Sequence, residues 1–394
     1  MKILITTDTF KPVVNGVVTS TINLYNELKL QGHDVKILTL SNSGETYIDK
    51  DVYYLKSKSI WIYPEARRAT FSITSNNLIK EIIDWKPDIV HSQSEFSTMI
   101  IARKITKSLG IPLVHTYHTM YEDYLSYFLK GKVINKARAA KIIKMLLDKV
   151  NMVIAPTDKT KNALINYGVD EPIKIIPTGI DLSRFMIEFS EDEKINLRKS
   201  IGISKEDKVL VYIGRIAQEK NIEEIIANFK YIVAGEKKAK LLIVGGGPYL
   251  DVLKEEAYKL NLLDNIIFIG MVKPEDVYKY YKISDMFVTA STSETQGLTY
   301  IEALSCGTPV ICRYDQCIED VVIDDYNGYT YSKNEDFISY AIKLLKDNEL
   351  RKEFSSNALS KSYEYSSELF GIRVYEVYKE VCEQSIKIDL LAAR

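Results

Sequence analysis

The sequence predicts an α/β protein built from two doubly wound parallel sheets. Short apolar runs of strand length alternate with longer segments of helical periodicity, which is the pattern of a parallel sheet with crossover helices. This alternation occurs twice, before and after a turn-rich connection at residues 176–181. At 394 residues and 46% hydrophobic content, the chain is long and apolar enough for two cores. We therefore expect an N-terminal domain at residues 1–180 and a C-terminal domain at residues 181–372, with a helix from about 373 to 394 that packs back on the first.

The first half contains five predicted strands, separated by segments with helical periodicity. The strands are Lys2–Thr7, Val35–Leu40, Asp88–His91, Leu113–Thr116 and Met152–Ala155, and the helices include Val17–Leu30, Ile73–Asp84 and Phe96–Leu109. Doubly wound sheets bind ligands at the carboxyl ends of their strands. The loops Asp8–Gly16, Ser92–Glu95 and Tyr117–Tyr127 are therefore the places to expect a site.

The second half repeats the pattern after a charged stretch at Glu188–Lys199. Its predicted strands are Val209–Ile213, Leu241–Val244, Ile266–Ile269, Met286–Thr289 and Val310–Cys312. They predict a second sheet of similar size.

Charge is distributed unevenly along the chain. Residues 1–185 hold 25 Lys and Arg against 18 Asp and Glu, whereas the remaining residues hold 27 against 35. Such asymmetry suggests an anionic partner for one domain, and nucleic acid and an anionic lipid surface are the two usual candidates. No apolar run approaches the ~20 residues of a membrane span, and the N-terminus lacks a signal-peptide pattern. The four cysteines have neither C-x2-C spacing nor disulfide density, so we expect a protein of a reducing, cytoplasmic compartment.

The first loop ends in Asn15-Gly16, immediately before a predicted helix. A glycine there allows close backbone approach and the helix N-terminus favours a phosphate, although Asn-Gly turns without a ligand are common. The loop lacks the G-x-G-x-x-G fingerprint, which argues against an NAD-dependent oxidoreductase.

The loop HTYHTMYEDYLSYF, residues 115–128, places aromatic residues around two histidines. Aromatic rings with polar tips suit sugars, acyl chains or a membrane interface, and histidine exchanges a proton near neutral pH. We interpret His115, at the strand end, as a core residue and His118, in the loop, as a functional one. Tyr121, Tyr124 and Tyr127 are candidates for contacts to an acceptor or a membrane.

Residues 130–150 carry seven Lys and Arg and one Asp, and they predict a basic amphipathic helix. At about 100° per residue, one arc of this helix is apolar and the opposite arc is basic. The apolar arc holds Ala139, Ile142, Ile143, Leu146, Leu147 and Val150, and the basic arc holds Arg138, Lys141, Lys144 and Lys149. Such a helix either lies on an anionic membrane, at ~1 kcal/mol per basic residue near the surface, or covers the sheet with a solvated lysine face. The apolar arc favours a sheet-covering helix, whose lysines could still meet lipid.

Two features at neighbouring predicted strand ends of the second half suit a diphosphate. Arg215 and Lys220 flank a short loop after the first strand, and Gly245-Gly246-Gly247-Pro248 follows the second. Arginine gives forked hydrogen bonds and lysine a point charge, so together with a glycine turn they predict a diphosphate clamp.

The segment Ser291–Val310 places Glu294 and Glu302 on either side of seven residues. Its pattern predicts the end of a strand, a polar loop and then a helix that ends at Gly307-Thr308-Pro309. Backbone N–H groups at the helix start would face an anion, and the carboxylates would accept hydrogen bonds from vicinal hydroxyls. By spacing alone, two solvated glutamates are the better interpretation.

Six features stand in one order along the chain. They are Gly16, HTYHTMYEDY, PTGID at 177–181, GRIAQEKN at 214–221, GGGP at 245–248 and the Glu294/Glu302 segment. In this order they resemble the retaining family-4 glycosyltransferases of the GT-B fold, over nearly the whole chain. Within that family, the His118–Tyr127 segment and the basic helix resemble the bacterial diacylglycerol glucosyltransferases, with the phosphatidylinositol mannosyltransferases as near neighbours. The resemblance implies two Rossmann-like domains that face a central cleft.

The resemblance also implies roles for the matching residues. Gly16 would lie at the donor diphosphate, Arg215 and Lys220 would neutralise it, Glu294 would bind the donor sugar and Glu302 the ribose. The donor site would be completed by Gly246, Thr295, Gln296, Gly297 and Leu298. His118 would position the sugar or shield its developing positive charge, because in these enzymes the leaving phosphate takes the acceptor's proton on the face of departure.

This chemistry requires no metal. Cations and N–H groups aimed at the leaving phosphate typically supply a few kcal/mol per donor. The one Asp-x-Asp, Asp49-Lys50-Asp51, has a lysine at its centre, so we expect a metal-independent enzyme without a cofactor.

We therefore expect a retaining hexosyltransferase that moves glucose from UDP-glucose to 1,2-diacylglycerol. It would associate peripherally with the inner face of the cell membrane through its basic N-terminal domain. One alternative is a cytosolic family-4 enzyme with a soluble acceptor, and another is a phosphatidylinositol mannosyltransferase-like enzyme that uses GDP-mannose. A third is a non-catalytic nucleotide-sugar or nucleic-acid binding protein. Glu294, Arg215 and Lys220 argue against it, and no motif with base-stacking aromatics is recognisable, so no nucleic-acid partner is expected.

Overall fold

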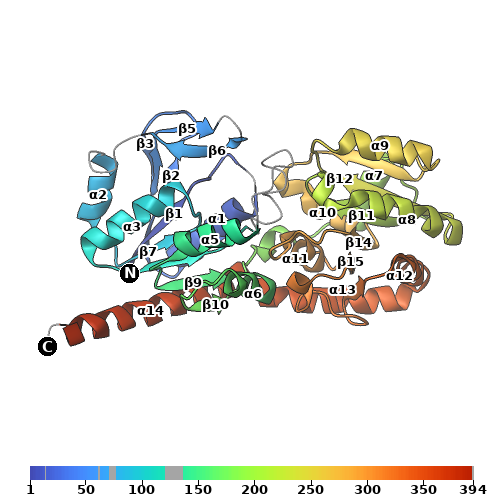
Figure 1. Cartoon of the computed structure of the whole chain (residues 1–394). Coiled ribbons are helices and arrows are strands. Elements are labelled where there is room, and N and C mark those ends of the chain that lie inside the picture. The colour runs from blue at the N-terminus through green and yellow to red at the C-terminus, as the bar shows by residue number, and fades with distance from the viewer. Residues whose placement is uncertain (14, 61–62, 71–76, 120–135, 393–394) are drawn as a thin grey trace. The chain divides into compact units, whose positions relative to one another are not determined.

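The structure is a computed structural model that describes residues 1–13, 15–60, 63–70, 77–119 and 136–392 (Figure 1). The chain forms two compact units. The N-terminal unit is Met1–Ile180 together with Ser367–Arg394, and the C-terminal unit is Asp181–Ser366. The last helix, α14, spans Ser367–Ala392, so it begins earlier than the predicted start near residue 373.

An eight-stranded sheet forms the centre of the N-terminal unit, in the order β10-β9-β8-β7-β1-β2-β4-β3. All neighbours pair in parallel except β3 and β4. The strands are β1 (Lys2–Thr7), β2 (Asp34–Leu40), β3 (Tyr47–Asp49), β4 (Val52–Leu55), β7 (Ile89–Ser92), β8 (Leu113–Thr116), β9 (Met152–Ala155) and β10 (Ile173–Ile175). A separate antiparallel hairpin pairs β5 (Ser57–Ile60) with β6 (Tyr63–Ala69).

Helices cover both faces of this sheet because side chains along a strand alternate between faces. The helices are α1 (Gly16–Leu30), α2 (Asn77–Trp85), α3 (Ser97–Leu109), α5 (Lys136–Leu147), α6 (Asp158–Asn166) and α14. Ile3 and Ile5 of β1 share a core with residues of α1 and α14, whereas Leu4 shares another with residues of α2, α3, α5 and α6. The last helix therefore belongs to the N-terminal unit, where the Ser367 hydroxyl donates a hydrogen bond to Glu27 at 2.6 Å.

The C-terminal unit contains a six-stranded parallel sheet in the order β13-β12-β11-β14-β15-β16. The strands are β11 (Lys208–Ile213), β12 (Ala239–Val244), β13 (Ile266–Gly270), β14 (Met286–Thr289), β15 (Val310–Arg313) and β16 (Gly328–Tyr331). The helices are α7 (Glu191–Ser200), α8 (Ile222–Gly235), α9 (Leu250–Lys259), α10 (Val277–Lys282), α11 (Leu298–Ser305), α12 (Asn334–Lys346) and α13 (Asn348–Ser362). Two parallel-sheet α/β units confirm the predicted fold class.

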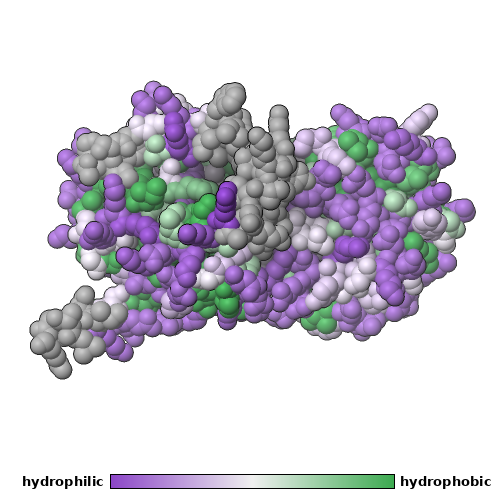
Figure 2. Space-filling view, viewed as in Figure 1, coloured by the Kyte–Doolittle hydropathy of each residue, from purple (hydrophilic) through white to green (hydrophobic). Residues whose placement is uncertain are grey.

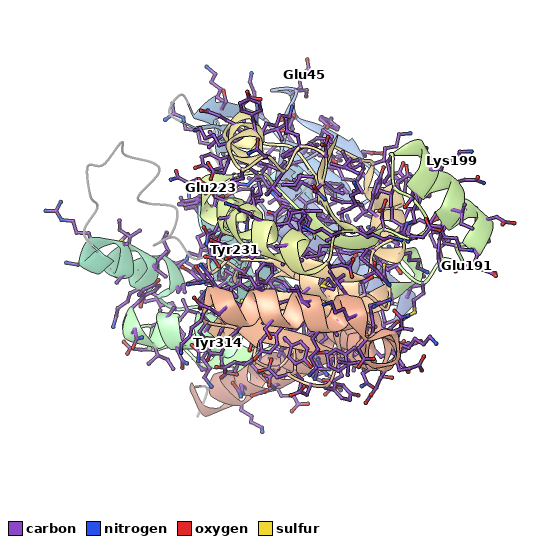
Figure 3. The ribbon with its side chains drawn as sticks, turned by 90° about the vertical axis from the view of Figure 1, so that its right-hand side faces the viewer. Glu45, Glu191, Lys199, Glu223, Tyr231 and Tyr314 are labelled. Carbon is purple, nitrogen blue, oxygen red and sulfur yellow. The ribbon has the colours of Figure 1, made fainter. Side chains whose placement is uncertain are left out.

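The charged stretch before the second sheet forms α7, whose residues are not buried. Ser190 and Glu193 form a reciprocal capping box at its start, with acidic residues in the first turn and basic residues in the last. Figure 3 labels Glu191 and Lys199 near the two ends of this helix. Because α7 has no buried face, its stability comes from its N-terminal capping box and from charges placed favourably at its two ends.

Strand order places the site loops at one edge of each sheet. In the N-terminal unit, the neighbours β1, β7 and β8 are followed directly by Asp8, Gln93 and Tyr117. In the C-terminal unit, the neighbours β12, β11 and β14 are followed directly by Gly245, Gly214 and Ala290. Since parallel strands end at the same edge, each set of loops forms one cluster.

Candidate functional site

The glycine turn after β12 is required by close packing of two loops in the C-terminal unit. A Cβ atom at Gly245, where φ is 137°, would lie 1.9 Å from the Gly214 carbonyl oxygen. A Cβ at Gly247 would lie 2.1 Å from the Ile216 carbonyl oxygen, and one at Gly246 would lie 2.7 Å from the Met271 side chain. Only glycine lets the loops after β11 and β12 approach this closely. Donor contact by Gly246 remains a prediction.

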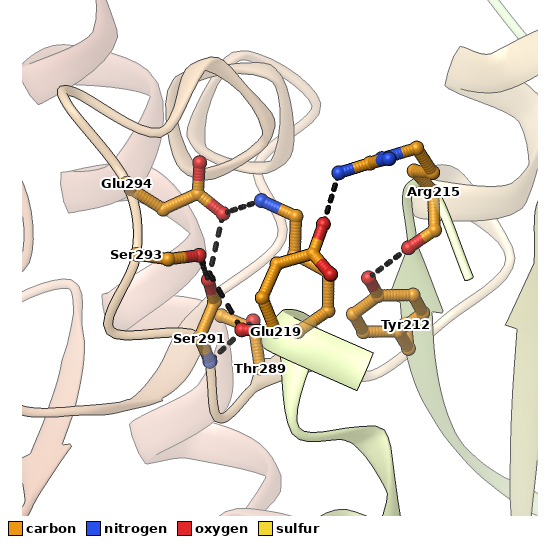
Figure 4. A network of polar contacts seen from close by, with 8 residues as sticks. Tyr212, Arg215, Glu219, Thr289, Ser291, Ser293 and Glu294 are labelled. Carbon is orange, nitrogen blue, oxygen red and sulfur yellow. Dashed lines mark hydrogen bonds and ion pairs between the residues drawn. The ribbon is translucent and has the colours of Figure 1, made fainter. Parts of the chain in front are cut away.

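Glu294 lies in a polar cluster of the same unit (Figure 4), where it pairs with Lys220. Lys220 ends a short 3-10 turn after β11, and Glu294 lies in the loop after β14. The Lys220 Nζ atom is 2.5 Å from Glu294 Oε1, and the Ser291 hydroxyl donates a hydrogen bond to the same oxygen at 2.8 Å. Their side chains are 15% and 22% exposed. Two residues distant in sequence are therefore held together, and each remains accessible to a ligand.

Arg215 makes a different pair. Its guanidinium contacts the Glu219 carboxylate, and its side chain is half exposed. Its carbonyl oxygen accepts a hydrogen bond from the Tyr212 hydroxyl at 3.0 Å, and Ser293 Oγ donates to the Glu219 carbonyl at 3.3 Å (Figure 4). Glu219 belongs to this cluster, although the sequence did not single it out. The predicted contact of Arg215 with a diphosphate would therefore compete with Glu219.

The start of α11 depends on Gly297. Its φ of 73° is in the left-handed region, and a Cβ there would lie 2.4 Å from the Tyr300 ring. Leu298 is the first residue of α11, whereas Thr295 and Gln296 precede it in the loop, with Gln296 buried. These four residues lie at a helix N-terminus, and their donor contacts remain predictions.

Glu302 has partners separate from those of Glu294. The Tyr281 hydroxyl lies 3.3 Å from Glu302 Oε2 and donates to the Thr299 carbonyl at 3.1 Å. Burial raises the pKa of Glu302 to about 7, while the hydrogen bond with Tyr281 and the charge of Arg184 oppose this shift. Ionising this carboxyl in the folded protein therefore costs stability. A contact of Glu302 with the donor remains a prediction.

Replacing Glu302 with glutamine should remove this pH-dependent cost. The folded pKa lies above the unfolded value of 4.5, so the stability from the protonated carboxyl is present below pH 4.5 and is lost as pH rises through 7. Relative to the wild type, Glu302→Gln should gain about 2 kcal/mol of unfolding free energy on going from pH 5 to pH 8. Urea unfolding of both proteins at the two pH values measures this gain. An equal stability difference at both pH values would contradict the assignment.

His118 is half-buried and lies against a buried polar cluster of the N-terminal unit, near the carboxyl ends of β1, β7 and β8. Its Nε2 atom is 2.7 Å from Gln93 Oε1, and Gln93 is 1% exposed. Burial lowers the pKa of His118 to about 4, although nearby Glu95 acts in the opposite direction. His118 is therefore a neutral imidazole at physiological pH.

Further buried polar residues surround this histidine. His115 is fully buried, as expected for a core residue, and its Nε2 atom is 3.4 Å from Glu95 Oε1. Asp8 accepts a hydrogen bond from the Thr98 backbone at 2.8 Å, and burial raises the pKa of Asp8 to about 6. The sequence analysis pointed to the loop Ser92–Glu95 but did not single out Asp8, Gln93 or Glu95. Asp8 gave a usable signal, because it directly follows an apolar strand and ligands bind at the carboxyl ends of strands in such sheets.

Gly16 is the first residue of α1 and is exposed. Asn15 caps this helix, because its side-chain oxygen accepts a hydrogen bond from the Val18 backbone at 2.9 Å. The N-terminus is therefore formed as predicted, and a donor contact by Gly16 remains a prediction. Tyr121, Tyr124 and Tyr127 lie outside the described residues.

The basic helix α5 is amphipathic, but its buried stripe is narrower than the predicted apolar arc. It buries a narrow stripe of Ala139, Ile143 and Leu147, whereas Ile142, placed on the apolar arc by sequence, is 44% exposed. Side chains four residues apart along α5 are enough to contact the sheet. Ile142, at the side of this stripe, therefore faces outward. Met145 is 65% exposed on this outer side, and Lys144 Nζ lies 2.7 Å from Asp170. Arg138 and Lys141 are exposed.

Among the described residues, none of the helices is long and apolar enough to cross a membrane. The face shown in Figure 2 is mainly hydrophilic, with small separate hydrophobic patches. Within the same described part of the chain, three or more His, Cys, Asp or Glu side chains do not gather in a group suited to a metal ion.

Comparisons with known proteins match both units. The model of Glycosyltransferase Family 4 matches residues 14–184, and that of Glycosyl transferases group 1 matches residues 193–361. The chain is 37% identical to alpha-monoglucosyldiacylglycerol synthase of Streptococcus pneumoniae, over 96% of this chain and 85% of that protein. It is 30% identical to the synthase of the same name from Acholeplasma laidlawii, over 98% and 99% of the two chains. The crystal structure of Anabaena Alr3699/HepE in complex with UDP shares the fold, with a TM-score of 0.76 and 16% identity over 96% and 100% of the two chains.

Proposed function

Because this chain belongs to the group 1, family-4 glycosyltransferases of the GT-B fold, we propose that it transfers glucose from UDP-glucose to 1,2-diacylglycerol with retention of configuration. The observation that carries the proposal is nearly full-length similarity to two alpha-monoglucosyldiacylglycerol synthases, at 37% and 30% identity. The polar clusters at the edges of the two sheets supply the groups that this reaction needs. The product would be an α-glucosyl diacylglycerol.

In this proposal the C-terminal unit binds the donor. Negative charge builds on the leaving phosphate as the glycosidic bond breaks, so Lys220 and Arg215 stabilise it most in the transition state. Glu294 accepts hydrogen bonds from the sugar hydroxyls, and its contact with Lys220 at 2.5 Å orients both groups before the donor binds. Glu302 accepts hydrogen bonds from the ribose. Gly246 and residues 295–298 give backbone contacts to phosphate and sugar.

The N-terminal unit supplies Gly16 at the diphosphate and His118 at the sugar. Positive charge develops on the sugar ring during transfer, and a neutral imidazole is compatible with that charge whereas an imidazolium would oppose it. The low pKa of His118, about 4, keeps the ring neutral over the working pH range. As the family mechanism implies, His118 would position the sugar or shield its positive charge, and the leaving phosphate would take the acceptor's proton.

We also assign membrane contact to the N-terminal unit. Arg138 and Lys141 are exposed beside the outward-facing apolar side chains of Ile142 and Met145, a combination suited to an anionic lipid surface. Contact of this kind would give a cytoplasmic protein peripherally associated with the inner face of the cell membrane. Nucleic acid is not a proposed partner.

Product analysis tests the proposal. The enzyme is offered UDP-glucose, UDP-galactose or GDP-mannose with one of three acceptors: diacylglycerol in mixed micelles, phosphatidylinositol in mixed micelles, or a soluble sugar. The products are separated and their anomeric configuration is determined. We expect an α-glucosyl diacylglycerol from UDP-glucose. Enzymes of this family are typically metal-independent, so a chelator should leave the rate unchanged. Mannosyl transfer from GDP-mannose to phosphatidylinositol, or glycosylation of soluble acceptors alone, would overturn the proposal.

A further inference from the structure

The contact between His118 and Gln93 determines which ring nitrogen of His118 carries a proton. The neutral imidazole has one N–H group and one lone pair, and Nε2 lies 2.7 Å from Gln93 Oε1, an atom that only accepts hydrogen bonds. Nε2 therefore carries the proton and donates it. Nδ1 is left as the ring atom that can accept a hydrogen bond.

Gln93 is itself fixed in place. It follows β7 directly, its side chain is buried, and its backbone N–H donates to the Thr6 carbonyl at 2.7 Å. Its side-chain Nε2 atom is buried and has no hydrogen-bond partner in the described part of the chain. Burying an unsatisfied amide N–H group costs free energy, which is not expected of a residue that serves folding alone.

The charged and titratable groups that face His118 come from neighbouring strands. They are Glu95 after β7, His115 on β8 and His91 on β7, and Asp8 after β1 lies next to Glu95. His91 already has partners on both ring nitrogens, Tyr378 at 2.6 Å and Thr116 at 2.7 Å. A carboxylate in direct contact with His118 Nε2 would favour the imidazolium, whereas the neutral amide of Gln93 does not.

We propose that Gln93 is a positioning residue for the transfer reaction, which holds His118 as the Nε2–H tautomer so that the Nδ1 lone pair is directed to the donor sugar. This inference rests on the proposed function. The negative end of the imidazole dipole then faces the ring where positive charge develops, and the lone pair accepts a hydrogen bond from a sugar hydroxyl. Gln93 thereby acts through His118 and need not contact the substrate.

Nitrogen NMR of the full-length, 15N-labelled protein tests the hydrogen bond without any substrate. The chain has four histidines, so His118→Asn assigns the ring signals of His118 directly. We expect a neutral ring protonated at Nε2 between about pH 5.5 and pH 8.5, and Gln93→Glu should raise the pKa of His118 into this range. A ring protonated at Nδ1, or unchanged ring signals in Gln93→Glu, would overturn the proposal.

Kinetics then test the consequence for transfer. Gln93→Glu should lower kcat about tenfold or more at pH 6, and the loss should shrink toward pH 9 as His118 becomes neutral again. Gln93→Met leaves only a weakly accepting thioether sulfur and no charge, so kcat should fall about tenfold at every pH. The matched control is Gln31→Glu at the far end of α1, which makes the same charge change and should match the wild type.

A pH profile of Gln93→Glu parallel to that of the wild type would reject the positioning role, because lost stability alone does not produce recovery at high pH. Full activity of Gln93→Met would reject it as well. If the wild type forms no glucosyl diacylglycerol, the proposed function fails, whereas the NMR measurement still decides the tautomer.

Discussion

Replacing Glu294 with glutamine should lower kcat about 10²- to 10³-fold while leaving the C-terminal unit folded. The substitution keeps the shape of the side chain and an oxygen to accept the Ser291 hydrogen bond. It removes the charge that orients Lys220 at 2.5 Å and weakens acceptance of the sugar hydroxyls. Loss of one preorganised group at a site of developing charge typically has this magnitude. Initial rates in mixed micelles and thermal unfolding of the same samples measure the two effects.

A matched control is Glu349→Gln in the same unit. Glu349 pairs with Lys352, but both side chains are strongly exposed, and such pairs contribute little. This control should have the activity and stability of the wild type. Near-normal turnover in Glu294→Gln would reject the donor-site assignment.

A double-mutant cycle with Lys220→Met tests whether the pair acts as one unit. Lys220→Met alone should lose at least as much activity as Glu294→Gln, because Lys220 is assigned to the leaving phosphate. The double mutant should lose far less than the product of the two single losses, because each single change already disrupts the pair. Multiplicative losses would show that Lys220 and Glu294 act independently.

Reversing the charges of Arg138 and Lys141 together should weaken binding to anionic vesicles by a factor on the order of 10² to 10³. Each basic residue near an anionic surface contributes about 1 kcal/mol, and reversal both removes the attraction and adds repulsion. Arg138→Glu/Lys141→Glu should therefore lose most of its activity on anionic vesicles but little in mixed micelles of uncharged detergent. Co-sedimentation and activity in both systems measure this, and high salt should reduce wild-type binding.

Lys144 offers the matched control on the same helix. Its ammonium group already pairs with Asp170 at 2.7 Å. Lys144→Gln should therefore reduce vesicle binding less than Lys141→Gln does. Equal losses in vesicles and micelles for Arg138→Glu/Lys141→Glu would indicate a folding defect and contradict the membrane assignment.

Strand positions could be read from the sequence wherever a strand is buried on both faces. The predicted bounds of β1, β8, β9 and β14 coincide with the observed strands, because central parallel strands appear as uninterrupted apolar runs. Four strands were not predicted, because they are short or lie near a sheet edge: β3, β4, β10 and β16. The hairpin β5–β6 was also missed, because its residues are largely polar and charged.

The candidate site was predicted only in part. Motif spacing and the family resemblance pointed to Lys220, Glu294 and His118, which lie at strand ends where ligands bind in such sheets. Glu219 and Gln93 were not singled out, because their importance comes from partners that the folded loops bring to them. Ile142 was placed on the apolar arc but is exposed in the structure. Helical periodicity gives the direction of an apolar arc, but not the width of the stripe that the sheet covers.

The sequence by itself determined the α/β class, the central strands and the residue types of the donor chemistry, because apolar periodicity and glycine positions are local properties of the chain. Only the tertiary structure decided which charged side chains pair and which ionisable groups have shifted pKa values. The Lys220–Glu294 contact, the neutral His118 and the raised pKa of Glu302 depend on distances and on exclusion of water. Both quantities arise only when loops distant in sequence come together at the edge of a sheet.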